Sequence, residues 1–265
     1  MGDDEVEFTI MSVAKPFVFA LICAAIGPDD VRRRIGLNAT GLPFNSLTAI
    51  EQGDGGRTNP MVNSGAIATT SLTPGATIDE RWRFIADGLS RFAGRQLALD
   101  GEVYRSASET NFVNRSIANL LESRSALSGD PADAVDLYTR QSCLAVSARD
   151  LATMGATLAL GGVNPLTGER VVDEETCRHV LAVVTTAGLY QTSGDWLYDV
   201  GLPGKSGIGG GIITVAPGKG GLATFAPPLD QAGNSVRGQL AAQFLSRALG
   251  LDIFMSRAED RVTAT

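Results

Sequence analysis

The sequence predicts an α+β protein in which an antiparallel sheet is flanked by helices and a helical subdomain stands beside it. Three features indicate this fold class. A buried helix is expected over residues 13–26, because almost every residue there is apolar. A long helical stretch follows, and strand patterns dominate only after residue 200, where "GIITVAPGKGGLATFAPPLD" predicts two strands joined at residues 217–220. The stretch 235–250 is again helical in pattern, so helices precede and follow the hairpin.

The N-terminal helix is expected to end at Gly27-Pro28, since glycine and proline commonly follow a helix C-terminus. Residues 41–75 are rich in Gly, Pro, Asn and Thr, which predicts a loop that contains a short buried helix. We expect one domain, 1–265, with two parts. The sheet-bearing part comprises residues 1–36 and 186–265, and the mainly helical part comprises residues 37–185.

Two further helices are expected in the helical part. The stretch "ATIDERWRFIADGLSRFA" has apolar residues at spacings of four, three, four and three, and Thr77 with Glu80 forms a capping box at its start. A second capping box, Ser147 with Asp150, opens a helix that stops at Gly161-Gly162. These apolar stripes predict packing surfaces.

Composition excludes several classes of partner. The chain has 265 residues, of which 44% are hydrophobic, enough for a sizeable core. Its 22 basic and 29 acidic residues give a net charge of -7, which disfavours nucleic acid and membranes as partners and favours small molecules. The apolar run 16–26 is too short to span a bilayer and lacks the flanks of a signal peptide. The widely spaced Cys23, Cys143 and Cys177 predict reduced thiols in a cytoplasmic protein without a metal site.

The stretch "TIMSVAKPF" contains a candidate nucleophile. If Ser12 lies in the first turn of a helix, Lys15 lies one turn later on the same face, and its amine can contact the serine hydroxyl. A buried lysine can lose its proton near neutral pH and act as a base, while the helix N-terminus favours a developing oxyanion. The alternative is a chance S-x-x-K pattern at the start of an apolar helix.

His179 is the only histidine, and this restricts the chemistry. It lies in "DEETCRHVLAV", an amphipathic helical stretch without the context of a catalytic triad, so we expect a packing or surface residue. A zinc site built on several histidines is excluded. A serine enzyme with this sequence must therefore take its base from a lysine or a tyrosine.

The stretch "GLPGKSG" is similar to a phosphate-binding loop but lacks its first glycine, whose place Asp199 takes, and it leads into a strand. A Lys-Ser-Gly triplet on a strand edge, with S-x-x-K upstream, is instead the pairing of penicillin-recognising serine enzymes. In that arrangement the backbone N–H of Ile208 joins that of Ser12 in an oxyanion hole. We expect "KSGIGGGIITV" to form one strand, whose glycines let the backbone approach a substrate.

Five ordered stretches together resemble the serine-dependent glutaminase family: "SVAKPFVFAL", "NPMVNSGAIATTSL", "LYTRQSCLAVSARDLATMGATLALGGVNP", "GLYQTSGDWLYDVGLPGKSGIGGGI" and "PPLDQAGNSVRG". The likeness extends from about Gly2 to Gly250. It implies a β-lactamase-like fold, hydrolysis of L-glutamine to L-glutamate and ammonia without a cofactor, and a homo-oligomer, either a dimer or a tetramer.

The resemblance also implies roles for individual residues. Ser12 corresponds to the nucleophile and Lys15 to its activating partner. Two tyrosines, Tyr138 and Tyr190, correspond to residues that face the bound amide and take part in proton transfer. The positions expected to contact substrate are Ser12, Asn63, Asn114, Tyr138, Tyr190 and Ile208, the last through its backbone N–H.

Two positions depart from the family pattern within "VYRSASETNFVNR". Ala107 stands where the family has a glutamate that would hold the substrate's amino group, and Val113 replaces the usual arginine. Glu109 could replace the lost carboxylate only if the local backbone shifts. Ala107, together with the short N-terminus described next, favours an alternative in which the chain is a catalytically impaired or inactive homologue with a binding or assembly role.

The family also has a segment before "GDADVPFS"-like sequence that supplies two strands and a further active-site tyrosine, whereas this chain begins at "MGDDEVEFTIMS". The expectation is a sheet reduced by two strands, an exposed edge that promotes self-association, and low stability. A third alternative, a penicillin-recognising enzyme, rests only on S-x-x-K with K-S-G.

Overall fold

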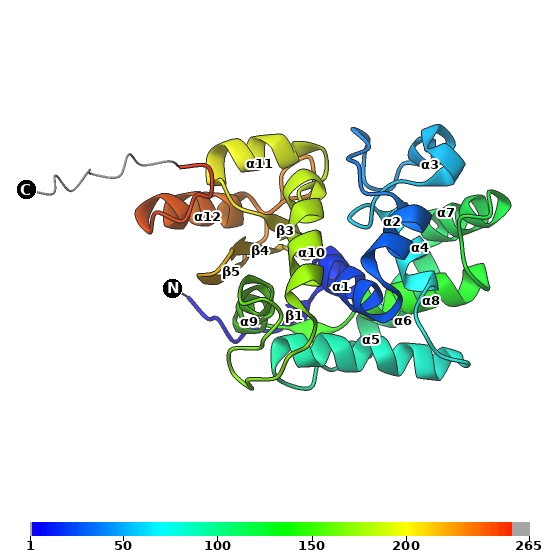
Figure 1. Ribbon diagram of the computed structural model, residues 1–265, viewed down its shortest axis with the longest axis horizontal. Coiled ribbons are helices and arrows are strands. Elements are labelled where there is room, and N and C mark those ends of the chain that lie inside the picture. Colours follow the sequence, from blue (N-terminus) through cyan, green and yellow to red (C-terminus); the bar gives the residue numbers. More distant parts are fainter. Residues whose placement is uncertain (1, 256–265) are drawn as a thin grey trace, which may run out of the picture.

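The computed structural model describes residues 2–255 and forms a mixed α+β fold in which α1 lies between a small sheet and a group of helices (Figure 1). The elements run in the order β1 (Phe8–Thr9), η1 (Met11–Ala14), α1 (Lys15–Ile26), α2 (Pro28–Ile35), α3 (Thr48–Gln52), η2 (Asp54–Gly56), α4 (Asn63–Ser71), α5 (Ile78–Ala93), α6 (Gly101–Thr110), α7 (Phe112–Ser123), α8 (Pro131–Ser142), β2 (Ala145–Val146), α9 (Ala148–Ala159), α10 (Glu174–Ala187), η3 (Tyr190–Thr192), α11 (Ser193–Val200), β3 (Gly204–Ser206), β4 (Gly211–Ala216), β5 (Gly220–Phe225) and α12 (Val236–Ala248). The predicted α+β class is confirmed.

The main sheet has the order β3-β4-β5 and is antiparallel throughout. The predicted hairpin is present as β4 and β5, joined at residues 217–219. The expectation of one strand through "KSGIGGGIITV" is wrong, because β3 ends at Ser206 and β4 begins at Gly211. The intervening glycines form a turn, in which the Gly210 N–H donates to the Gly207 carbonyl and Gly210 has a φ of 94°.

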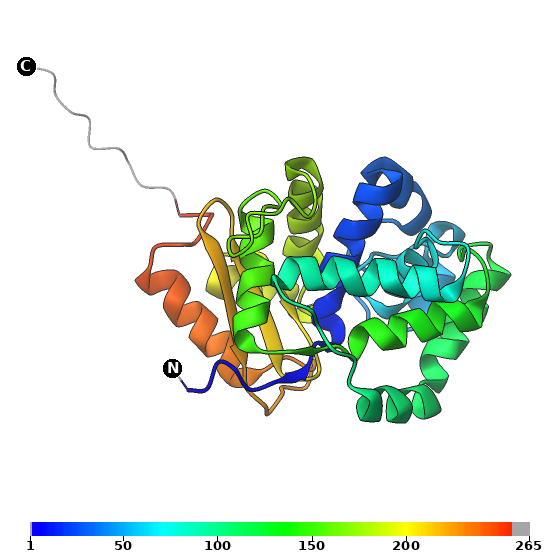
Figure 2. The same ribbon diagram turned by 90° about the horizontal axis from the view of Figure 1, so that it is seen from below.

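The sheet lies between α9 on one face and α12 on the other (Figure 2). Glycine permits the close contact with α9, since a Cβ on Gly221 would lie 2.3 Å from the Ala156 nitrogen. On the opposite face, a Cβ on Gly238 of α12 would lie 2.6 Å from Thr224 Oγ1 of β5. Because α9 falls within 37–185, the sheet is covered by helices from both expected parts of the chain.

The helix α1 is the centre of the core. Every residue from Lys15 to Cys23 is buried, in agreement with the apolar pattern that predicted a buried helix. Phe17 packs on Phe92 of α5 with ring centroids 5.1 Å apart. At Gly88 of α5 a Cβ would lie 2.4 Å from Leu21, so the absence of a side chain lets the two helices approach. This packing fixes the helix that carries Lys15.

The helix boundaries confirm both predicted capping boxes. Thr77 and Glu80 cap α5 reciprocally, and Ser147 and Asp150 do the same for α9. In residues 2–255 no single helix is long and apolar enough to cross a membrane. Met11–Ile26 and Pro28–Ile35 satisfy the length and composition only as a pair, across a bend of 118°.

Candidate active site

Ser12 and Lys15 lie side by side at the start of the central helix. Ser12 is in η1 and is 9% exposed, whereas Lys15 opens α1 and is 2% exposed. The Lys15 Nζ donates a hydrogen bond of 2.6 Å to the Ser12 Oγ. The contact expected from the S-x-x-K spacing is therefore present. Since η1 touches β3 on one side and α8 on the other, the pair lies where the sheet meets the helical group.

Lys15 occupies a site without a counter-charge. Its Nζ also donates to the Asn63 Oδ1 at 3.0 Å, and within residues 2–255 no carboxylate forms an ion pair with it. Burial lowers the pKa of Lys15 to about 7, because an ammonium is costly to remove from water. A substantial fraction of Lys15 is therefore a neutral amine at physiological pH.

Asn63 joins Lys15 to residues on two other helices. It opens α4, and its Oδ1 accepts a second hydrogen bond from the Tyr138 hydroxyl of α8, also at 3.0 Å. Its Nδ2 donates to the Asn114 Oδ1 of α7 at 3.0 Å. The structure thus brings together Ser12, Lys15, Asn63, Asn114 and Tyr138 in one hydrogen-bonded network, which we call the serine network.

Tyr138 and Tyr190 flank the serine. Burial raises the pKa of Tyr138 above its ordinary value, and hydrogen bonding to the Ser12 hydroxyl opposes the rise only in part. Burial also raises the pKa of Tyr190, against hydrogen bonds with Ser12 and Ser206. Both phenols are therefore protonated near neutral pH and can donate a proton. They are poor candidates for a standing phenolate base.

The turn between β3 and β4 approaches the serine from the sheet side. A Cβ on Gly207 would lie 3.3 Å from the Ser12 backbone nitrogen and 3.1 Å from Val13 Cγ2. The next residue, Ile208, is 50% exposed, and its backbone N–H makes no hydrogen bond within residues 2–255. A free N–H on the residue after Gly207, which itself adjoins Ser12, is consistent with the oxyanion hole expected from the sequence.

The positions that depart from the family pattern lie outside the serine network. Ala107 is half-buried on α6, whereas Glu109 and Val113 are exposed. Neither Glu109 nor any other carboxylate of residues 2–255 is hydrogen-bonded to a member of the serine network. His179 lies on α10, where its Nε2 is 3.6 Å from the Glu175 carboxylate, so it takes no part either.

Sequence reasoning missed Lys205 as a side chain. The K-S-G triplet drew attention to this stretch, but only the backbone after it was given a role. Lys205 is completely buried in β3, with its Nζ 4.4 Å from the centre of the Tyr190 ring. The pattern contains a signal for this, because a lysine within an otherwise apolar, glycine-rich strand is unusual.

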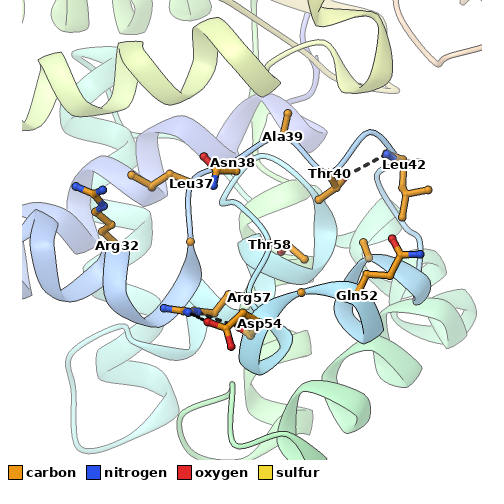
Figure 3. Close-up of a pocket in the computed structure, with 13 residues that line it drawn as sticks. Arg32, Leu37, Asn38, Ala39, Thr40, Leu42, Gln52, Asp54, Arg57 and Thr58 are labelled. Atoms are coloured by element: carbon orange, nitrogen blue, oxygen red, sulfur yellow. Dashed lines mark hydrogen bonds and ion pairs between the residues drawn. The ribbon is translucent and has the colours of Figure 1, made fainter.

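A cavity of about 480 Å³ lies apart from the serine, between α2, the loop after it and α3 (Figure 3). Its lining mixes apolar residues with polar ones, which include Arg32, Asn38, Thr40, Asp54 and Arg57, and Arg57 is paired with Asp54. None of the expected site residues lines it. Within residues 2–255 no three His, Cys, Asp or Glu side chains are grouped as metal ligands.

The antiparallel sheet and the helical group, with the hydrogen-bonded Ser12 and Lys15 at their junction, define a hydrolase with a β-lactamase-like fold. The comparisons with known proteins specify the family. The glutaminase family model matches residues 1–254, and this chain belongs to the glutaminase family. The fold and the family expected from the sequence are thereby confirmed.

Individual relatives agree with this assignment. The chain is 71% identical to Glutaminase 2 of Yersinia pestis over 255 residues, which are 96% of this chain and 75% of that protein. It is 51% identical to a glutaminase of Brucella canis over 258 residues, or 97% of this chain and 81% of the relative.

Two solved structures have the same fold. A probable glutaminase, ybaS, superposes with a TM-score of 0.95 at 47% identity, covering 97% of this chain and 83% of that one. A Bacillus glutaminase gives a TM-score of 0.92 at 31% identity and covers 95% and 87% of the two chains. The family membership argues against the penicillin-recognising alternative.

Proposed function

We propose that this chain hydrolyses L-glutamine to L-glutamate and ammonia through a γ-glutamyl ester on Ser12. The observation that carries the proposal is the 2.6 Å hydrogen bond between Ser12 and a lysine whose pKa is lowered to about 7. A serine hydroxyl is a weak nucleophile until a base removes its proton, and Lys15 is placed to do so.

In the first step the Ser12 Oγ bonds to the side-chain amide carbon of glutamine, and the hydroxyl proton passes to the neutral Lys15 amine. The carbonyl oxygen becomes an oxyanion, which the backbone N–H groups of Ser12 and Ile208 stabilise. The N-terminus of α1 adds positive potential at the same place. No carboxylate of residues 2–255 is bonded within this network to oppose the developing charge.

In the second step the amide nitrogen takes a proton and leaves as ammonia. Tyr138 and Tyr190 relay that proton, because burial keeps both phenols protonated and both lie against Ser12. Lys15 returns to the neutral form. It then removes a proton from a water whose oxygen bonds to the ester carbon. The bond between that carbon and the Ser12 Oγ breaks, Lys15 returns the proton to the Oγ, and glutamate is released.

Asn114 is the best-placed group to orient the substrate. Its Oδ1 already accepts from Asn63, whereas its Nδ2 makes no hydrogen bond within residues 2–255. A free amide donor in the serine network suits a carboxylate or carbonyl oxygen of glutamine. Asn63 orients the catalytic groups instead, because its Oδ1 accepts hydrogen bonds from both Lys15 and Tyr138.

The test is ammonia and glutamate release by Ser12→Ala. The variant lacks the ester-forming oxygen, so we expect activity to fall by at least about a thousandfold. Ser123→Ala is the matched control, because Ser123 is exposed on α7 and bonds only to a backbone carbonyl. Mass spectrometry of acid-quenched wild type should find the ester on the peptide that contains Ser12. Wild-type turnover in Ser12→Ala would contradict the assignment.

A second candidate, a catalytically impaired homologue, is favoured by one observation. Ala107 offers no carboxylate, and Glu109 is exposed and outside the serine network. If wild type binds glutamine but releases no ammonia, this candidate replaces the first. We also propose a cytoplasmic location and a homo-oligomer. The three buried free cysteines support a reducing compartment, and light scattering measures the oligomeric state.

A further inference from the structure

Lys205 is a buried amine that the proposed mechanism does not use. It lies in β3 with 0% exposure, and its Nζ donates a hydrogen bond of 2.6 Å to the Ser206 carbonyl. The same Nζ lies 4.4 Å from the centre of the Tyr190 ring. No carboxylate within residues 2–255 forms an ion pair with it. A lysine so placed needs an explanation, because a buried charge is ordinarily paired.

Tyr190 depends on its surroundings for its conformation. Its φ of 56° is uncommon for an aromatic residue and requires support from the rest of the structure. Phe44 packs on one side of the ring with centroids 4.7 Å apart, and Lys205 lies at 4.4 Å. The Tyr190 hydroxyl donates to the Ser206 carbonyl at 3.4 Å, which is the oxygen that Lys205 also uses. The Lys205 amine and the Tyr190 hydroxyl therefore donate to the same carbonyl oxygen of β3.

The strand β3 is itself firmly held against this segment. A Cβ on Gly188 would lie 1.8 Å from the Gly204 carbonyl oxygen, so the two backbones are in direct contact. The Ser206 hydroxyl donates to Asn234 Oδ1, and Asn234 Nδ2 donates to Thr192 Oγ1 at 3.0 Å. These bonds join β3, η3 and the turn before α12.

The charged and titratable groups that face Lys205 are few. Two such groups on neighbouring elements interact with Lys205: Lys15 on α1, through charge repulsion, and Tyr190 on η3, through its ring. Asp230 influences Tyr190, but its carboxylate is occupied by the backbone N–H groups of Ala232 and Asn234 and by Gln239. A positive charge on Lys205 would therefore have only carbonyl and ring contacts, and Lys15 nearby.

We propose that Lys205 is a positioning residue that works as a neutral amine. It holds Tyr190 against Ser12, and because it stays uncharged, Lys15 can accept the serine proton. This inference rests on the proposed function. Burial, followed by repulsion from Lys15, lowers the pKa of Lys205 well below its ordinary value, in agreement with the geometry. If both amines were charged, the second charge would have no partner in the site.

The charge state can be measured directly, because Lys15, Lys205 and Lys219 are the only lysines in the sequence. Wild type labelled with ¹³C at lysine Cε should give three NMR signals, which Lys205→Met and Lys219→Arg assign. We expect the Lys15 signal to titrate near pH 7 and the Lys205 signal to keep the neutral-amine shift at that pH. An ammonium shift for Lys205 at pH 7 would overturn the proposal.

The positioning role is tested by the pH profile of ammonia release. Lys205→Met keeps the packing against Tyr190 but loses the hydrogen bond to Ser206. We expect kcat to fall by about 10- to 100-fold while the acid limb of the profile keeps its pH, because no charge is removed. Lys205→Arg adds a permanent charge, so its acid limb should move to lower pH and kcat should fall further.

The controls separate this role from a purely structural one. Lys219→Met changes an exposed lysine and should match wild type. Thermal melting identifies a variant that fails to fold. If Lys205→Arg does not fold, Lys205→Met and the NMR titration decide, and if Lys205→Met does not fold, the NMR titration of wild type decides. Full activity in Lys205→Met would refute the positioning role, and so would an acid limb that this variant moves upward. If wild type releases no ammonia, the proposed function fails, and the titration still decides the charge of Lys205.

Discussion

Asn63→Asp should move the acid limb of glutamine hydrolysis to higher pH. Asn63 Oδ1 is 3.0 Å from the Lys15 Nζ, and the substitution replaces a neutral oxygen with a charged one of the same shape. Two unit charges 3.0 Å apart attract by about 5 kcal/mol at an effective dielectric constant of about 20. Desolvation of the new carboxylate offsets part of this attraction. An adjacent carboxylate typically moves a pKa by about 1 to 3 units.

The size of the effect follows from the pKa of Lys15, which burial lowers to about 7. At pH 7 about half of Lys15 is neutral in wild type, against about 9% after a rise of one unit and about 1% after two. The kcat/KM of Asn63→Asp should therefore be lowest at acid pH and recover toward pH 9. Loss of the Asn63 amide also lowers the rate at every pH, but it does not move the limb.

The assay is ammonia release between pH 5 and 10, at substrate concentrations that give kcat/KM, because this ratio reports the free enzyme. Asn119→Asp on α7 is the matched control, since it changes the net charge equally at an exposed position. His179→Asn checks that the histidine does not produce the limb. A limb that stays near pH 7 in Asn63→Asp, or that disappears in His179→Asn, would refute the assignment of Lys15 as the base.

Two further predictions concern stability and specificity. Lys15→Met should raise the melting temperature at pH 7, because lowering a lysine pKa from 10.5 to about 7 costs up to about 5 kcal/mol of folding free energy. Between about pH 7 and pH 10.5, Lys15 is protonated in the unfolded chain and neutral in the folded chain. The free energy of unfolding of wild type should therefore rise with pH over this range, and the variant should lose that rise. Ala107→Glu should lower KM for glutamine by about 10- to 100-fold, since a charged hydrogen bond contributes about 1.5–3 kcal/mol. Glu109→Gln is its control, and a large loss of activity in that variant would show that Glu109 already binds the amino group.

Local patterns predicted the elements that carry the site. The apolar run at 13–26 gave a buried α1, and the two capping boxes marked the starts of α5 and α9. The contact of Ser12 with Lys15 also follows from spacing, because residues three apart share a helix face. Periodicity and spacing suffice where the interacting residues are close in sequence.

Contacts between distant residues could not be predicted in that way. Asn63 and Asn114 are 51 residues apart, and only the packing of α4 on α7 brings their amides together. The resemblance to glutaminases indicated both positions, but spacing alone did not. The break between β3 and β4 was missed because glycines fit a strand edge and a turn equally well, and the positive φ of Gly210 decides for the turn.

The serine network contains no carboxylate of its own, and the proposed reaction produces one. Glutamate released from the Ser12 ester has a new γ-carboxylate beside Lys15, where an anion finds the only counter-charge that the network can offer. When Lys15 is protonated, this product is held as an ion pair, and when Lys15 is neutral it is free to leave. Inhibition by glutamate should therefore weaken as the pH rises through 7. The lysine that starts the reaction would then also govern how quickly the product departs.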